Sequence, residues 1–250
     1  METTNRHDQR LDLGNKIASA LIKQGKDALA QESELNWLNN FQPGKRVFRG
    51  KAYKTVKRIM DLVIVIVSLP FWLPLIGIVY LAIIVTSPGA PAIFIQKRTG
   101  RNGKRFNLYK FRTMVPNAEE LKQTYAHLNE LQWPDFKITN DPRVTKLGSF
   151  LRKTSLDELP QLFNILKGEM SLVGPRPTSF AADTYKLWHT ERLDVIPGLT
   201  GLWQIIGRAS LEFDDRLRLD IAYIERQSIL LDIVILYKTI MAVFKQRGAV

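Results

Sequence analysis

The sequence predicts an α+β fold, mainly helical, with one segment that enters a membrane. A run of about 25 uncharged residues, Leu62 to Thr86, exceeds the roughly 20 that a helix needs to cross a bilayer. Two strand-like segments flank a turn at Asn102-Gly103, which indicates a small β-hairpin. Helices are expected over residues 210–226 and 229–244. Charges interrupt the second of these, which favours a packed or interfacial amphipathic helix.

Composition and charge indicate the class of partner. The chain has 250 residues, 45% of them hydrophobic, so most of it is expected to fold in water as one domain beside the membrane segment. The net charge of +12 favours anionic partners: lipid headgroups, nucleotides, phosphorylated substrates or nucleic acid. The absence of cysteine excludes disulfides and thiolate metal sites, and it fits a reducing cytosol.

Shifts in composition divide the chain into three parts. Residues 1–56 are expected to form a polar N-terminal extension, without the apolar core of a signal peptide. Residues 57–90 contain the membrane segment, which ends in a cluster of turn residues. Residues 91–250 carry the short polar motifs and are expected to form the cytosolic domain.

The apolar run has clusters of Lys and Arg on both sides. Such residues tend to stay on the cytoplasmic side of a membrane, and a helix that crosses once cannot keep both ends there. Pro70 and Pro74 offer a place to bend, because proline removes a backbone hydrogen bond and clashes with the preceding turn. A spanning helix with tolerated proline kinks fits the same residues. Charge and proline alone leave both topologies open.

The predicted hairpin carries two cations. Its strands are expected at Ile93–Gln96 and Phe106–Phe111. Because alternate side chains of a strand share a face, Lys110 and Arg112 are expected on the same face.

Asp157 and Glu158 follow two cations, the first of which is Arg152. One interpretation is a capping box, because Ser155 stands three residues before Glu158 and acids suit a helix N-terminus. Pro160 weakens this interpretation, since its missing N–H would fall inside the helix ladder. The alternative puts the carboxylates at the mouth of a helix. There they would hold Mg²⁺ while cations and free N–H groups bind a phosphate.

The segment Gly174-Pro175-Arg176-Pro177 is a second candidate site. Its prolines restrict the backbone around Arg176, which lowers the entropy cost of presenting the guanidinium to a phosphate. A stiff turn with a solvated arginine fits equally well. Residues 197–204 look like a third loop. The three histidines lack metal-ligand spacing, and no phosphate-binding or dinucleotide-binding glycine motif is present, which argues against a soluble nucleotide hydrolase or a redox enzyme.

Taken together and in order, the motifs resemble those of the bacterial sugar transferase family, the monotopic polyprenyl-phosphate phosphoglycosyl transferases. Each motif is weak, but their joint order, from about Lys57 to the C-terminus, is specific. Besides the apolar segment with its prolines, the motifs are Lys57-Arg58 with Asp61, Gln96–Gly100, Lys110–Met114, Asp141–Thr145, Ser155–Gln161, Asn164, Gly168–Ser171, Val173–Pro177, Pro197–Gly201, and Asp220 with Tyr223.

The resemblance implies transfer of a sugar 1-phosphate from a UDP-sugar to undecaprenyl phosphate, with release of UMP. This reaction is the first membrane step of exopolysaccharide, capsule or O-antigen synthesis. Asp157 would be the nucleophile and form a covalent aspartyl–phosphosugar intermediate, while Glu158, with Asp157, would bind Mg²⁺. Phosphoryl transfer needs such an in-line nucleophile with cations beside the phosphoryl oxygens. The implied substrate contacts are Arg152, Lys110, Arg112, Arg176, Pro175 and Pro177.

The same resemblance, with the need to keep Asp157 beside a lipid phosphate, favours a re-entrant helix–break–helix. The protein is then monotopic in the bacterial inner membrane, with residues 57–90 as the re-entrant hairpin. Residues 91–250 are the catalytic domain on the cytosolic face, with interfacial helices. The family breaks its membrane helix at a Ser-Pro pair. Here the register puts Leu73-Pro74 at that position, so the serine is missing and Pro70 is expected to compensate.

Two rival classes explain less. A nucleic-acid-binding protein accounts for the charge but not for the uncharged run, and a membrane scaffold gives no reason for carboxylates among cations. Membrane lipid is therefore an expected partner, nucleic acid is not, and a homodimer is left open. The stretch 115–140 and the ending 247–250 resemble the hexose-1-phosphate branch of the family. No motif identifies the sugar.

Overall fold

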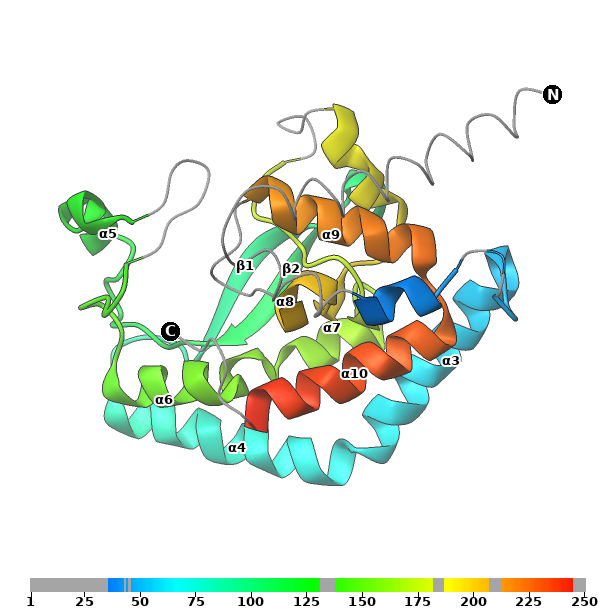
Figure 1. Cartoon of the computed structure of the whole chain (residues 1–250). Coiled ribbons are helices and arrows are strands. Elements are labelled where there is room, and N and C mark those ends of the chain that lie inside the picture. Colours follow the sequence, from blue (N-terminus) through cyan, green and yellow to red (C-terminus); the bar gives the residue numbers. More distant parts are fainter. Residues whose placement is uncertain are drawn as a thin grey trace.

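The computed structural model of the chain describes residues 36–42, 44, 46–130, 138–181, 187–206 and 213–244. Most of the N-terminal extension lies outside these residues, as do 131–137 and 247–250, which carried part of the resemblance to the hexose branch. In the described part, helices dominate and two short two-stranded sheets complete the fold (Figure 1). The predicted α+β, mainly helical class is confirmed.

The apolar run is divided between two helices that meet at an angle along one edge of the molecule (Figure 1). Helix α3 covers Gly50–Val67, and helix α4 covers Leu69–Thr86. Of the helices that the structure describes, only α4 is long and apolar enough to cross a membrane, judged by length and composition. Helix α3 has a basic first half and an apolar second half.

The break between α3 and α4 falls at Ser68. Its hydroxyl donates to the carbonyl one turn earlier at 2.6 Å, and Trp72 Nε1 donates to the carbonyl of Val65 at 2.9 Å. Two carbonyls at the end of α3 thus have side-chain donors. Pro70 stands in the first turn of α4, where its missing N–H breaks no helix bond. Pro74 lies inside α4, so the break comes earlier than the sequence indicated, and a serine does occupy it.

The predicted hairpin is confirmed. Strand β1 (Ile93–Thr99) pairs with β2 (Arg105–Phe111) in an antiparallel register that sets Phe94 opposite Lys110. The connection contains the turn η3 (Arg101–Gly103), and both residues of the predicted Asn-Gly turn have positive φ. Asparagine and glycine tolerate this conformation better than other residues.

The two adjacent carboxylates lie between helix α6 (Lys146–Thr154) and helix α7 (Gln161–Lys167), in the 3₁₀ turn η5 (Leu156–Glu158). The capping-box interpretation is wrong. Ser155 ends α6 in the left-handed conformation, with φ of 57°, and its side chain caps no helix. Pro160 directly precedes α7, so the carboxylates stand before the helix, as the alternative interpretation required.

A second sheet, absent from the sequence prediction, pairs β3 (Ser171–Val173) with β4 (Gly198–Thr200) in parallel. Part of the expected third loop is therefore a strand. Glycine is needed here because a Cβ on Gly198 would lie 2.1 Å from the backbone nitrogen of Gly174. The parallel pair fixes where the chain leaves β3 and enters the Gly174–Pro177 segment.

Helix α9 (Phe213–Arg226) and helix α10 (Ile229–Phe244) confirm the two C-terminal helices. Buried side chains of α3, α7, α8 and α10 share one core cluster, and α4, α6 and the hairpin share another. Large apolar side chains remain exposed on α4 and α10, for example Phe71 at 80% and Ile240 at 52%. The remaining short elements are η1 (Asn36–Asn40), α5 (Leu121–Thr124), η4 (Ala126–Leu128), η7 (Leu187–Asp194) and α8 (Leu202–Ile206).

Candidate active site

The structure brings together ionisable side chains from four separate parts of the chain. Asp157 and Glu158 come from turn η5, Lys110 from strand β2, Arg176 from the loop after β3, and Arg152 from the last turn of α6. All five were singled out from the sequence. Strand β2, η5 and the loop after β3 meet because α7 and the two sheets pack on a shared core.

Glu158 is held by two cations. Lys110 Nζ donates to its Oε1 at 3.1 Å, and the Arg176 guanidinium donates to both carboxylate oxygens, one of them at 3.3 Å. Burial by itself would raise the pKa of Glu158. Arg176 and Lys110 outweigh that effect and hold this pKa well below its usual range. Glu158 is therefore held in its charged form. Because Arg176 forms an ion pair with Glu158, the alternative of a solvated arginine in a stiff turn is wrong.

Asp157 differs from its neighbour because its carboxylate makes no hydrogen bond to any residue that the structure describes. Burial raises its pKa, and the charge of Glu158 acts in the same direction. Lys110, Arg176 and Arg152 oppose that rise. The result is a half-buried carboxylate with cations around it and no hydrogen bond to a described residue, so its lone pairs are available to a ligand.

Arg152 reaches this site because α6 packs very closely on the segment after β2. A Cβ on Gly148 would lie 1.9 Å from the carbonyl oxygen of Thr113, so only glycine permits the approach. Arg152 Nε then donates to Thr113 Oγ1 at 3.0 Å. Burial lowers the pKa of Arg152, and the charge of Asp157 opposes this fall.

Lys110 and Arg112 were expected to share a strand face, and their side chains bond different partners. Strand β2 ends at Phe111, although the N–H of Arg112 still donates to the carbonyl of Ala92 at 2.8 Å. The Arg112 guanidinium donates instead to the carbonyl of Ser87, directly after α4. Its Nε and Nη1 atoms are buried without a hydrogen-bond partner among the described residues.

Pro175 and Pro177 lie beside Arg176 and line a shallow cleft. The cleft continues over Thr99 and Pro197, which belong to the end of β1 and the segment before β4. The prolines thus border the space next to the paired Arg176.

Two further residues fix the carboxylate segment, and the sequence analysis had noted them only as parts of motifs. Arg58 on α3 donates to the last carbonyls of α7, including that of Leu166 at 2.9 Å. The fully buried Asn164 on α7 donates to the carbonyl of Asn107 at 2.7 Å and accepts from the backbone N–H of Tyr109 at 3.2 Å. Asn164 therefore aligns β2, and with it Lys110, against α7.

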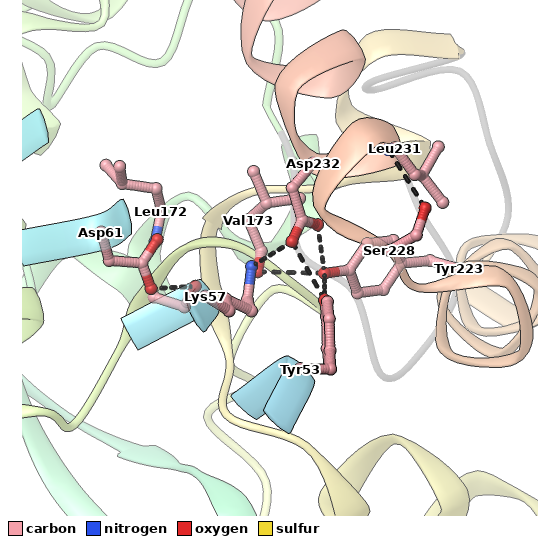
Figure 2. Close-up of polar contacts among 10 residues, drawn as sticks. Tyr53, Lys57, Asp61, Leu172, Val173, Tyr223, Ser228, Leu231 and Asp232 are labelled. Carbon is pink, nitrogen blue, oxygen red and sulfur yellow. Dashed lines mark hydrogen bonds and ion pairs between the residues drawn. The ribbon is translucent and has the colours of Figure 1, made fainter. Parts of the chain in front are cut away.

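A buried hydrogen-bond network connects α3 to the C-terminal helices (Figure 2). Asp232 on α10 accepts from Tyr53 at 3.0 Å, from Lys57 at 2.8 Å and from Tyr223 at 2.7 Å. Since α3 continues directly into the break and α4, this network sets α10 relative to these two helices.

Asp61, one helical turn after Lys57, reaches the strand that leads to the site. Its carboxylate accepts from Ser171 Oγ at 2.7 Å and from the backbone N–H of Leu172 at 3.2 Å (Figure 2). Both donors belong to β3, and the Gly174–Pro177 segment follows that strand directly. One helix, α3, thus contacts α7, β3 and α10.

A metal ion at this site would need ligands from the substrate as well as from the protein. In the part of the chain that the structure describes, no group of three or more acidic or histidine side chains could hold a metal. Asp157 has free lone pairs, however, and Glu158 Oε2 accepts only one hydrogen bond. Mg²⁺ is often bound by one or two carboxylates together with substrate phosphates. The two carboxylates fit a Mg²⁺ ion that a bound diphosphate completes.

An unbonded aspartate beside an ionised glutamate, among three cations, suits a substrate that carries phosphate groups. The profile of the family "Bacterial sugar transferase" matches residues 52–246, and the chain belongs to this family. The resemblance inferred from the motifs is confirmed.

Named relatives resemble about four fifths of the chain. An undecaprenyl-phosphate galactose phosphotransferase of Salmonella typhimurium is 46% identical over 204 residues, 80% of this chain and 42% of that protein. The galactosyl transferase CpsE of Streptococcus agalactiae is 44% identical over 199 residues, 77% of this chain and 43% of that protein. The exopolysaccharide production protein ExoY of Sinorhizobium fredii is 42% identical over 200 residues, 77% of this chain and 87% of that protein. The chain thus spans about two fifths of the first two proteins and most of the third.

Proposed function

We propose that this protein transfers a sugar 1-phosphate from a UDP-sugar to undecaprenyl phosphate and releases UMP. The reaction is the first membrane step in the synthesis of an exopolysaccharide, capsule or O-antigen. The observation that carries the proposal is Asp157, a carboxylate without a hydrogen-bond partner among the described residues and close to three cations. Names of relatives that include galactose transfer and exopolysaccharide production support it.

In the first half-reaction, an Asp157 carboxylate oxygen attacks the sugar-bearing phosphorus of the UDP-sugar. The bond from this phosphorus to the bridging oxygen breaks, UMP leaves with that oxygen, and an aspartyl–phosphosugar remains. Lys110, Arg152 and Arg176 lie where they can neutralise charge on the phosphoryl oxygens. Pro175 and Pro177 border Arg176 and would contact the nucleotide.

In the second half-reaction, a phosphate oxygen of undecaprenyl phosphate attacks the same phosphorus and displaces Asp157. The product is an undecaprenyl diphosphate sugar, and the carboxylate is regenerated. Arg112 suits contact with the acceptor phosphate, because it lies where α4 ends and two of its buried nitrogens have no partner among the described residues.

Asp157 and Glu158 would hold Mg²⁺ together with the substrate diphosphate. When bound, the ion would neutralise charge on the phosphates. Glu158 itself stays anionic and keeps Lys110 and Arg176 beside the reacting group.

The same geometry supports a placement in the membrane. We propose that α3 and α4 form a re-entrant hairpin with both ends on the cytosolic face of the bacterial inner membrane, which makes the protein monotopic. The break at Ser68, the exposed apolar side chains of α4 and the basic clusters at both ends support this. The exposed apolar side chains of α10 suit an interfacial helix.

The reaction is tested with the purified full chain in vesicles that contain undecaprenyl phosphate and Mg²⁺. A panel of UDP-sugars is screened for UMP release, which also identifies the sugar. We expect repeated turnover with at least one UDP-hexose, dependent on the acceptor; without acceptor, no more than one UMP per protein should be released. Without acceptor, a radiolabelled sugar phosphate should remain on the wild-type protein and not on the Asp157→Asn variant. Label on both proteins would contradict the nucleophile.

The topology is tested with single cysteines in intact cells, since the native chain has none. Asn40→Cys and Lys104→Cys place exposed thiols before α3 and after α4. With a membrane-impermeant reagent, we expect neither to react until the inner membrane is permeabilised. Labelling of one position alone in intact cells would indicate a crossing helix.

A further inference from the structure

The loop that presents Arg176 is fixed through its carbonyl groups. Pro175 and Pro177 have no N–H, so Arg176 carries the only backbone donor of these three residues. All three carbonyls accept hydrogen bonds: that of Pro175 from the N–H of Gly198 at 2.9 Å, that of Pro177 from Arg98 Nη1 at 3.2 Å, and that of Arg176 from Arg192. The position of Arg176 thus depends on donors that reach in from elsewhere.

Of these three donors, Arg192 is the one whose own side chain is held by a buried carboxylate. It is only 7% exposed, on η7, and its Nη2 group donates both to the Arg176 carbonyl and to Asp220 Oδ2, the latter at 2.7 Å. Asp220 is 1% exposed, on α9. The Nη2 group of Arg192 therefore uses its two hydrogens to connect helix α9 to the loop that carries Arg176. Because Arg192 and Asp220 are both buried, this connection is rigid.

We propose that Arg192, anchored by Asp220, is a positioning residue for the donor nucleotide. It acts by holding the Arg176 backbone so that the guanidinium faces Glu158 and the substrate phosphates. The inference rests on the proposed function, because it takes the UDP group as the ligand of Arg176. Arg192 also lines the cleft beside Pro175 and Pro177, so its displacement would change the surface that the nucleotide meets.

The test measures UDP binding to the full chain in detergent micelles by calorimetry, together with the KM and kcat of UMP release. In Arg192→Lys the charge is kept but the planar fork is lost. We expect the Kd for UDP and the KM for the UDP-sugar to rise about tenfold, the factor of one charge-assisted hydrogen bond. The kcat should change much less. The control is Arg218→Lys, in a partly exposed ion pair with Asp215 on the same helix α9, which should change neither constant.

A lower thermal midpoint with an unchanged Kd for UDP would mean a structural role only and would overturn the inference. If Arg192→Lys does not fold, Asp220→Asn takes its place. This variant removes only the negative charge of the anchor, and a threefold rise in Kd is expected. No rise would again overturn the positioning role. Absence of UDP binding by the wild-type protein would instead contradict the proposed function itself, and this inference with it.

Discussion

Asp157 and Asp232 are both carboxylates with positively charged side chains nearby, but they differ in how many hydrogen bonds they accept. Asp232 is fully buried and accepts three hydrogen bonds, from Tyr53, Lys57 and Tyr223 (Figure 2). Asp157 is half-buried and accepts none from the residues described. A buried charge whose bonds are complete contributes to architecture. A carboxylate that lies near cations but accepts no hydrogen bond from them is available to a substrate.

The largest expected effect that tests this contrast is the loss of activity in Asp157→Asn. An amide cannot act as the nucleophile, so UMP release should fall by at least about a thousandfold. The raised pKa of Asp157 means that its charged form is disfavoured in the folded state, so stability should stay equal or increase. UMP assays and denaturant titration of the same preparation check both statements. If Asp157→Asn lowered the free energy of unfolding as much as an Asp232 variant does, the contrast between the two carboxylates would be wrong.

Asp232→Asn should behave in the opposite way. Removing one member of a buried charge pair leaves Lys57 without its partner, which costs about 3 kcal/mol or more of unfolding free energy. The folded fraction should still release UMP, because no atom of Asp232 belongs to the site. Asp215→Asn, in a partly exposed ion pair with Arg218, is the matched control and should cost less than about 1 kcal/mol. Equal effects of the two variants on stability would show that burial is not the deciding factor.

Asp220 is an intermediate case and gives the smallest effect. Burial raises its pKa to about 7, although Arg192 acts against this rise. Between the ordinary aspartate pKa of about 3.9 and pH 7, the folded state therefore holds more protons than the unfolded state. Stability should fall as the pH rises through this window and then level off.

Comparison with Asp220→Asn isolates this contribution. The wild-type thermal midpoint minus that of the variant should decrease by a few degrees between about pH 4.5 and pH 7.5. If the difference between the two thermal midpoints is constant with pH, Asp220 does not titrate in this window and resembles Asp232, whose hydrogen bonds are complete.

Local signals were sufficient for the elements and for most of the candidate residues. The Asn102-Gly103 turn predicted the hairpin, because these residues tolerate positive φ. Pro160 weighed against a capping box, because a proline cannot donate within a helix. The family followed from the order of short motifs, and four of the five ionisable residues that meet at the site lie within them; Arg152 lies three residues before the Ser155–Gln161 motif.

Other features depended on contacts between distant segments. The parallel pairing of β3 with β4 is set by backbone approach at Gly198, which leaves no periodic pattern in two three-residue strands. The contact of the Arg112 guanidinium with the carbonyl of Ser87, directly after α4, is one that alternation along the strand could not predict. The break at Ser68 instead of Pro74 depends on a hydroxyl and an indole that bond carbonyls at the end of α3.

The sequence by itself determined the fold class, the family and the identity of Asp157 and its surrounding cations, since these depend on residue type and order. The tertiary structure decided which of the two adjacent acids is bonded and which is free. Lys110 and Arg176 lie 48 and 18 residues from Glu158 along the chain, and only folding brings them to its side chain. The same holds for α3, which contacts α7, β3 and α10 through Arg58, Asp61 and Lys57 and so links the site to the apolar helix α4.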